Sequence, residues 1–417
     1  MSNRFNLSKD LYISGRIGWK GLNKDEYLDE SDYRIINATA LENGYIDWNN
    51  CGYISKERFE ESQDIILQEN DILISKDGTL GKIGYVKNLH FNCTVAAGIF
   101  VLRKKNNKIN FDYLYHLLKS DIFKDFISRN KASGSTINHL YQRDLENFEI
   151  ELPDLNTQLK IAGLLNLIDF KISNNKSTIK TLESTIKTIY DYWFIQFEFP
   201  SKDFKPYKTS GGEVVFNNKI NKFIPVNWKV DNLYSIADFI NGLACQNYRA
   251  KEGEPYYDVI KIKEMNNGIT LNTEKCTQQI PTKYVIHDGN ILFSWSASLN
   301  VIYWYGGTSA LNQHIFKVIP KSQYLEEYTY QVLRDYVFTF SKIANSRKTT
   351  MGHITSDHIK QSVILIPPED ILSQFSDAVF PLRKKIEVCS KEIISLHKLK
   401  DFIFPLLING QVSFMNI

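Results

Sequence analysis

Two loops of this chain carry residue types that hold phosphates or distinguish bases. The first, Ser75-Lys-Asp-Gly-Thr-Leu-Gly-Lys82, joins two predicted strands and combines two glycines with Lys76, Thr79 and Lys82. Exposed backbone N–H groups beside lysine and threonine are a common means of holding phosphate oxygens. An ordinary basic hairpin would have the same composition, so both interpretations of this loop stay open.

The second loop occurs twice, as 132–139 and as 346–353. Asparagine can pair with adenine through two hydrogen bonds, arginine and lysine can pair with guanine, and serine can bind bases or phosphates. A histidine that recurs at equivalent places is often only a buried, hydrogen-bonded ring. The candidate nucleic-acid contacts in these stretches are Ser135, Asn138, His139, Arg347, Lys348 and His353.

Further candidates lie in the second half of the chain. Lys261 and Lys263 alternate along a predicted strand, which would place both on one face, and Arg249 lies in the preceding loop. Ser296 belongs to Ser294-Trp-Ser-Ala-Ser298, which stands where the basic loop stands in the first half but lacks its lysines. As ordinary surface residues these would need no special role, so nucleic-acid contact is one of two interpretations.

Most sequence patterns of catalytic sites are missing. Gly78-Thr-Leu-Gly-Lys82 has the wrong spacing for a P-loop, and no dinucleotide-binding, zinc-protease or serine-hydrolase motif occurs. Asp154, Asp169 and Lys171 have the residue types of a restriction-nuclease Mg²⁺ site. Such a site needs its carboxylates at adjacent strand ends, whereas Asp169 lies in a predicted helix. An Mg²⁺-dependent nuclease using these three residues is the alternative function.

The elements that carry the loops occur twice in the sequence. Tyr33-Arg-Ile-Ile36 recurs as Tyr257-Asp-Val-Ile260, and Asn70-Asp-Ile-Leu-Ile-Ser75 recurs as Gly289-Asn-Ile-Leu-Phe-Ser294. The offset between equivalent positions changes only from 224 to 214 residues along the chain. An internal duplication suits a two-fold object, and the commonest such object is duplex DNA.

Each copy has the composition of a compact mixed α/β domain. Short strand-like runs separated by Gly, Asn and Asp come first, followed by a stretch with helical spacing (111–129 and 326–340) and a last strand before a proline. The predicted boundaries are 1–152 and 229–366 for the two domains, 153–199 and 367–417 for the helices that follow them, and 200–228 for an extended linker.

The helix after each domain has apolar residues at alternating steps of four and three, the period of a coiled-coil seam. We expect the two helices to pair antiparallel within the chain; packing of each helix on its own domain is the alternative. Asn175 is polar at a core position, and Pro381 predicts that the second helix starts or kinks nearby. The predicted seam positions are Leu165, Ile168, Ile172, Asn175, Ile179, Leu182, Ile186, Val379, Leu382, Ile386, Ile393 and Leu396.

Composition limits the class of protein. The 417 residues suffice for two to three domains, and an apolar fraction of 43% excludes global disorder. A net charge of only +3 is low for a non-specific polyanion binder, so basic groups must be placed locally or supplied by partners. The five cysteines are scattered, which favours a reducing cytoplasm, and no segment approaches the roughly 18 apolar residues of a membrane span.

Together these features resemble the specificity (S) subunit of type I restriction–modification systems. The resemblance covers nearly the whole chain, and motifs that are weak alone occur in the family's order. They are Gly15-Arg-Ile-Gly-Trp-Lys-Gly21, Gly134-Ser-Thr-Ile-Asn138, Leu152-Pro153 with Gln158 and Ile161, Trp193-Phe194 with Phe197, Ile224-Pro225 with Trp228, and Leu406-Leu407 with Gly410. Lys20, within the first motif, joins the candidate contacts. The second copy departs from the pattern at 350–353 and at Pro381.

The resemblance implies an α+β fold with two duplicated mixed α/β target recognition domains separated by an antiparallel two-helix coiled coil. Each domain would read one half of a bipartite target in double-stranded DNA, and the helices would set the spacing and dock two methyltransferase subunits. Motor-nuclease subunits would complete the complex. S-adenosylmethionine, ATP and Mg²⁺ would bind these partners, and this chain would be non-catalytic. A coiled-coil scaffold without a DNA role is the third interpretation.

Overall fold

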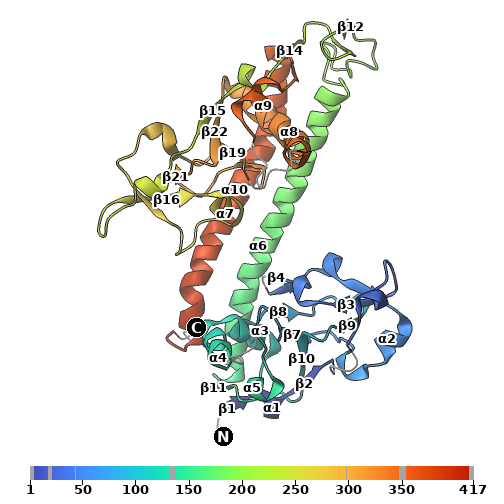
Figure 1. Cartoon of the computed structure of the whole chain (residues 1–417), viewed down its shortest axis with the longest axis vertical. Helices are drawn as coiled ribbons and strands as arrows, with labels where there is room; N and C mark the ends of the chain where they lie inside the picture. Colours follow the sequence, from blue (N-terminus) through green and yellow to red (C-terminus); the bar gives the residue numbers. More distant parts are fainter. Residues whose placement is uncertain are drawn as a thin grey trace. The chain divides into compact units, whose positions relative to one another are not determined.

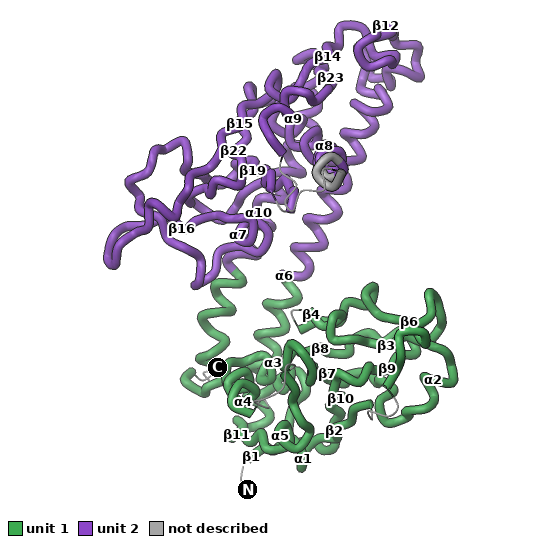
Figure 2. The backbone as a smooth tube through the Cα atoms, in the orientation of Figure 1, with its two compact units in different colours: residues 1–171, 396–417 green, residues 172–395 purple. Residues whose placement is uncertain are grey.

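The computed structural model describes residues 4–16, 21–42, 44–130, 138–296, 298–346 and 354–412 (Figure 1). The chain forms two compact units: residues 1–171 with 396–417 are unit 1, and residues 172–395 are unit 2 (Figure 2). Both long helices pass from one unit into the other, so each unit contains part of each helix.

Unit 1 begins with short strands and ends with helices. Its strands are β1 (Arg4–Asn6), β2 (Leu11–Gly15), β3 (Tyr33–Ile36), β4 (Leu41–Glu42), β5 (Tyr45–Ile46), β6 (Gly52–Ile54), β7 (Ile72–Ser75), β8 (Ile83–Tyr85), β9 (Asn92–Val95), β10 (Ile99–Lys104) and β11 (Glu149–Glu151). Its helices are α1 (Leu7–Asp10), α2 (Lys56–Glu60), α3 (Phe111–Lys119), α4 (Asp121–Asn130), α5 (Gln142–Leu145) and the first part of α6 (Leu155–Tyr190).

An antiparallel four-stranded sheet in the order β2-β10-β7-β8 lies at the centre of unit 1. Alternate residues of β7 enter different cores, because Ile72 and Ile74 pack with the helices while Leu73 packs on the opposite face. Both faces are therefore covered, and all four residues of β7 are buried. This explains why the strand is an apolar run and not an alternating pattern. A second sheet, β6-β3-β9, contains one parallel pair, β3 with β9.

Unit 2 has a similar series of elements. Its strands are β12 (Val214–Asn217), β13 (Lys222–Pro225), β14 (Lys229–Asp231), β15 (Ala237–Asn241), β16 (Tyr256–Ile260), β17 (Lys275–Thr277), β18 (Val285–Ile286), β19 (Ile291–Ser294), β20 (Asn300–Tyr303), β21 (Ser309–Leu311), β22 (Ile315–Pro320) and β23 (Ile364–Ile366). Its helices are α7 (Ile262–Asn267), α8 (Glu326–Ser346), α9 (Ser356–Lys360) and most of α10 (Glu369–Ile408).

The sheets of unit 2 repeat those of unit 1. The order β15-β22-β19-β20 corresponds to β2-β10-β7-β8, and every neighbouring pair is antiparallel in both. The order β17-β16-β21 corresponds to β6-β3-β9, with the same single parallel pair, and β18 adds a fourth strand beside β21. The pair β14-β23 corresponds to β1-β11. The predicted internal duplication is therefore confirmed.

Some predicted elements differ from the structure. The single helix predicted at 111–129 is wrong, because Ser120 separates α3 from α4 and its hydroxyl donates to the carbonyl of Leu117 (2.6 Å). The second long helix does not start near Pro381, since α10 begins at Glu369 and runs across it. Pro381 is exposed, so water can bind the carbonyl that would otherwise accept its missing N–H.

The predicted extended linker is also more ordered than its composition indicates. It contains the antiparallel hairpin β12–β13, in which Phe216 faces Phe223. At the base of the hairpin, the Phe199 ring stacks on Tyr207 (centroids 4.5 Å apart) and on Trp228 (5.6 Å). Aromatic packing, which no strand or helix period reveals, holds this segment in place.

In unit 2 the two long helices run antiparallel. Asn175 Nδ2 donates to Glu392 Oε2 (2.8 Å), and Arg383 Nη1 donates to Glu183 Oε1 (2.5 Å), so rising numbers on α6 meet falling numbers on α10. The seam position Asn175 is thus buried but satisfied. Six predicted apolar seam positions belong to or pack against one core of unit 2: Ile179, Leu182, Ile186, Val379, Leu382 and Ile386.

Unit 1 contains the other ends of the same helices. Ile161 and Leu165 of α6 share a core with Leu407 and Ile408 of α10. Asp169 accepts a hydrogen bond from Lys400. Of the remaining predicted seam positions, Ile168 is buried and Leu396 half-buried in unit 1. In unit 2, Ile172 is buried and Ile393 half-buried. No described helix in either unit is long and apolar enough to cross a membrane.

A buried charge cluster ties α8 to both long helices within unit 2. Arg383, whose side chain is 12% exposed, donates to both carboxylate oxygens of Glu327 (2.8 Å each) and to Glu183. Its guanidinium lies 4.3 Å from the centre of the Tyr303 ring. Burial opposes the charged guanidinium, but the hydrogen bonds and charge of Glu327 outweigh this and raise the pKa of Arg383.

We expect Arg383→Met to destabilise the protein by about 3–5 kcal/mol, because it leaves the buried carboxylate of Glu327 without its cationic partner. Glu183 keeps its ion pair with Arg334. Urea denaturation followed by circular dichroism measures the loss. The neighbouring Lys384→Met is the control, since the Lys384 side chain is 58% exposed. Equal midpoints for the two variants would contradict the role given to this cluster.

Candidate nucleic-acid interface

In unit 1 the two predicted contact loops lie side by side. The backbone N–H of Leu140 donates to the carbonyl of Lys76 (2.9 Å), and the N–H of Gly78 donates to the carbonyl of Asn138 (3.1 Å). The side chains of Asp77 and His139 also pair. Residues 76–82, which follow β7, therefore form one surface with residues 138–141, which lie 62 positions further along the chain.

A buried serine shapes the first loop from below. Ser75, with no exposed surface, donates its hydroxyl to the carbonyl of Thr79 (2.6 Å) and accepts from the N–H of Lys82 (2.9 Å). The N–H of Gly81 donates to the Ser75 carbonyl (2.9 Å). Gly78 and Gly81 have φ values of +70° and +74°, a conformation that glycine adopts without strain.

The side chains on this surface differ in how exposed they are to solvent. Thr79 and Asn138 are exposed. Lys76 is half-buried with its ammonium 4.6 Å from the centre of the Phe100 ring, and burial lowers its pKa. Lys82 donates to the carbonyl of Ala38 (3.3 Å). Both lysines thus have contacts inside the protein, whereas Thr79 and Asn138 are the exposed predicted residues on the described part of this surface.

Two residues beside this surface were not predicted from the sequence. The Tyr141 ring, 43% exposed, packs edge-on against His139 (centroids 4.5 Å apart). The Arg143 guanidinium lies 4.9 Å from the Tyr141 ring centre, and the Arg143 side chain is 79% exposed. The sequence signal that could have identified these two residues is an aromatic residue followed two positions later by an arginine.

The second copy builds the same frame with other side chains. Ser294 donates its hydroxyl to the carbonyl of Ser298 (2.6 Å) and accepts from the N–H of Asn300 (2.8 Å), as Ser75 does in the first copy. The N–H of Ile354 donates to the carbonyl of Trp295 (3.0 Å), the counterpart of the bond from Leu140 to Lys76. The Trp295 indole donates to Asn241 Oδ1 (3.0 Å), where the first copy has a lysine on an aromatic ring.

The other predicted residues of the second copy lie elsewhere. The prediction that Lys261 and Lys263 alternate along a strand is wrong: β16 ends at Ile260, Lys261 caps α7, and Lys263 lies within that helix. Lys261 forms an ion pair with Glu274 (2.5 Å), and this hydrogen bond lowers the pKa of Glu274. The strand prediction failed because an apolar-basic alternation also fits the start of a helix.

Arg249 and Ser296 differ in exposure. Arg249 is exposed in the segment that pairs with Cys276, whereas Ser296 is buried, with 5% of its surface accessible. Five predicted contacts lie outside the described residues: Lys20, Ser135, Arg347, Lys348 and His353.

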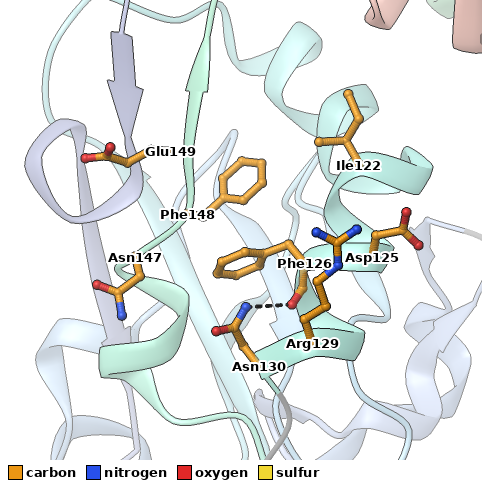
Figure 3. A pocket seen from close by; sticks show the side chains of 8 residues that line it. All are labelled: Ile122, Asp125, Phe126, Arg129, Asn130, Asn147, Phe148 and Glu149. Atoms are coloured by element: carbon orange, nitrogen blue, oxygen red, sulfur yellow. Dashed lines mark hydrogen bonds between the residues drawn. The ribbon is translucent and has the colours of Figure 1, made fainter.

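A shallow pocket of about 480 Å³ lies between α4 and the start of β11 (Figure 3). Phe126 and Phe148 meet edge to face in its wall, with ring centroids 5.0 Å apart. Asp125 and Glu149 also line it, opposite in charge to Arg129. Two carboxylates disfavour a polyanion, so this pocket is not part of the candidate interface.

The nuclease alternative requires a metal site that the structure does not form. Asp154 caps α6 by accepting from the N–H groups of Asn156 (3.0 Å) and Thr157 (3.1 Å). Asp169 lies fifteen residues further on, so about 22 Å separates the two at ~1.5 Å per helical residue. Asp169 pairs with Lys400, and the described residues contain no cluster of three or more His, Cys, Asp or Glu side chains suited to a metal.

Comparison with known proteins places this geometry in a family. The model of the type I restriction modification DNA specificity domain matches residues 17–184 and 209–398. The chain is 26% identical over 377 residues to the type I restriction enzyme MjaIX specificity subunit of Methanocaldococcus jannaschii, covering 86% of this chain and 81% of that one. It is 24% identical over 367 residues to the EcoKI specificity subunit of Escherichia coli K12, covering 83% and 73%.

A solved structure shares the fold. The S subunit of a type I restriction–modification system from M. genitalium aligns with a TM-score of 0.57 at 15% identity, covering 99% of this chain and 96% of that chain. The two matches of the family model fall on the two copies and the long helices between them. The chain belongs to the type I restriction modification DNA specificity family, in which it is a non-catalytic specificity subunit that acts in a complex with methyltransferase and motor-nuclease subunits on DNA.

We expect Ser75→Ala to loosen the first loop, because the carbonyl of Thr79 and the N–H of Lys82 lose their shared partner. The cost of leaving such groups unpaired is about 1–3 kcal/mol. Hydrogen exchange should show faster exchange at residues 76–82 and no change at 295–300, and Ser294→Ala should give the reverse. The exposed Ser177→Ala is the control. Unchanged hydrogen exchange in both loops would contradict the role given to the two buried serines in shaping them.

Proposed function

We propose that each paired-loop surface reads one half of a bipartite sequence in duplex DNA. One observation carries the proposal: the same serine-centred frame occurs in both copies while the side chains it displays differ. A constant frame fixes where a loop lies against a groove, and variable side chains distinguish base edges. Two copies with different side chains would then read two different half-sequences.

The side chains of the first surface suit discrimination more than strong phosphate binding. Asn138 and Thr79 are exposed, whereas Lys76 and Lys82 have contacts inside the protein. Phosphate contacts supply most of the salt-dependent affinity for DNA. We infer that the partner subunits supply much of that affinity and that this chain supplies sequence selectivity, which agrees with its net charge of +3.

The long helices offer a docking face for the methyltransferase subunits. On α6, four large apolar side chains are exposed at 46–69%: Leu155, Leu159, Leu167 and Phe170. At 100° per residue they occupy one arc of the helix, opposite the arc of Ile161 and Leu165, which is already buried. We infer that two methyltransferase subunits dock on such faces, one for each half of the duplicated chain.

The proposed complex divides the chemistry among its chains. S-adenosylmethionine would bind to the methyltransferase subunits, and ATP and Mg²⁺ to the motor-nuclease subunits, in the cytoplasm. This chain would hold none of these groups. Its role would be to place the methyltransferase subunits over chosen adenines and to fix the distance between the two half-sequences.

We expect replacement of residues 1–152 by the corresponding domain of a relative to change one half of the methylated sequence. The other half should stay the same, because residues 229–366 are untouched. Methylation-sensitive sequencing of DNA treated with the reconstituted methyltransferase complex measures both halves. The reciprocal exchange of 229–366 is the control. A change in both halves after either exchange would contradict independent reading.

We expect one heptad added to each long helix, after Ser177 and after Ser390, to lengthen the spacer between the half-sequences. Seven residues add about 10 Å at ~1.5 Å per residue, or roughly three base pairs at ~3.4 Å each. The bases recognised in each half-sequence should not change. The two insertion points lie beside the Asn175–Glu392 pair, so the apolar period continues on both sides. A change in the recognised bases with no change in spacer length would refute the proposal that the helices set the spacing.

A further inference from the structure

The hairpin β12–β13 is firmly anchored at its base. Ile224 is buried at 1% and belongs to the core of unit 2. The Tyr207 hydroxyl donates to the carbonyl of Glu213 (2.7 Å), and the N–H of Gly212 donates to the carbonyl of Tyr207 (2.8 Å). In Figure 1, β12 lies beyond the C-terminal end of α6. The fold thus holds this hairpin in a defined place.

The outer part of the hairpin exposes large apolar side chains. Phe216 and Phe223 are register partners whose rings lie 5.1 Å apart, yet they are 45% and 62% exposed. Val214 lies on the same face, two residues from Phe216, and is 38% exposed. Phe204, in the preceding turn, is 89% exposed. A concentration of exposed phenylalanine on an ordered element marks an interaction site.

Lysines surround these side chains. Residues 202–222 contain five lysines, all exposed, against the two acidic residues Asp203 and Glu213. The local excess of three positive charges equals the net charge of the whole chain. None of the five forms an ion pair with another described residue. The lysines of this segment are Lys202, Lys205, Lys208, Lys219 and Lys222.

The exposed phenylalanine rings and the surrounding lysines together indicate which class of partner binds this hairpin. A DNA backbone would satisfy the lysines but would leave the phenylalanine rings in water. A protein interface buries aromatic side chains at its centre and places charged groups at its rim, which matches this arrangement. The edges of a two-stranded sheet also leave backbone groups free to bind an added strand or loop.

We propose that the hairpin surface, formed by Phe204, Val214, Phe216, Phe223 and the five lysines, docks a partner-protein segment that carries carboxylates beside large apolar side chains. The proposal rests on the proposed function only because the partner is sought among the other subunits of the same complex. Its residues are distinct from those of the paired-loop surfaces and from the exposed apolar residues of α6.

A photo-crosslinking experiment tests this directly. Phe223→p-benzoylphenylalanine is introduced into the full chain, which is assembled with the methyltransferase and motor-nuclease subunits and irradiated. We expect a cross-link to a partner segment rich in Asp or Glu beside large apolar residues, identified by mass spectrometry. The same probe at Phe338 is the control, because Phe338 is 67% exposed in unit 2 but lies on α8 and not on the hairpin.

A second measurement tests the charge. Lys219→Glu with Lys222→Glu should reduce the cross-link at Phe223 at least tenfold, whereas Lys251→Glu with Lys263→Glu should leave it unchanged. All four lysines are exposed or half-buried in unit 2, so the folded state should persist, as thermal denaturation can verify. A cross-link to DNA, to this chain alone, to a segment without carboxylates, or to nothing would overturn the proposal.

The outcome is independent of sequence recognition. If the wild-type complex fails to direct methylation to a defined sequence, the proposed function fails, and the cross-link can still form. If methylation is directed correctly and no partner cross-link forms, only the hairpin proposal fails.

Discussion

Two apolar helix stripes, on α6 and α10, must be buried away from water, and the rest of the structure depends on this. The stripes lie more than 200 residues apart in the sequence. Each stripe alone would leave a long seam in water. Within unit 2 they share one core, and within unit 1 the opposite ends of the same helices share another. Burial of such stripes, at roughly 25 cal/mol per Å² of apolar area, holds each domain on the helix pair without any disulfide or metal among the described residues.

The duplication separates what is constant from what varies. The constant part is the sheet order, the single parallel strand pair and the buried serine after the central strand. Each of these has its hydrogen-bond partners within the backbone or from the serine hydroxyl. The frame therefore does not depend on which side chain follows the serine. The two copies differ there: Lys76 packs on the Phe100 ring in one, and Trp295 donates to Asn241 in the other.

Elements that depend on periodicity were predictable from the sequence, and elements that depend on tertiary contacts were not. The repeated strands follow from short apolar runs bounded by Gly, Asn and Asp, and the seams of α6 and α10 follow from heptads. The repeated loops carry part of the resemblance to the family. The sequence could not show that Lys82 reaches the carbonyl of Ala38 or that Ser296 is buried, because both depend on segments distant in sequence. The ordered segment before Trp228 was missed for the same reason: stacked rings have no sequence period.

The hairpin β12–β13 occurs in only one of the two copies. The central four-stranded sheets, the paired loops and the long helices each have a counterpart in the other half, but this hairpin has none among the described residues. Whatever it binds can be present only once for each specificity chain. A protein segment bound there would therefore make the assembly asymmetric. Its two halves would no longer be equivalent, even though each contains the same kind of recognition domain.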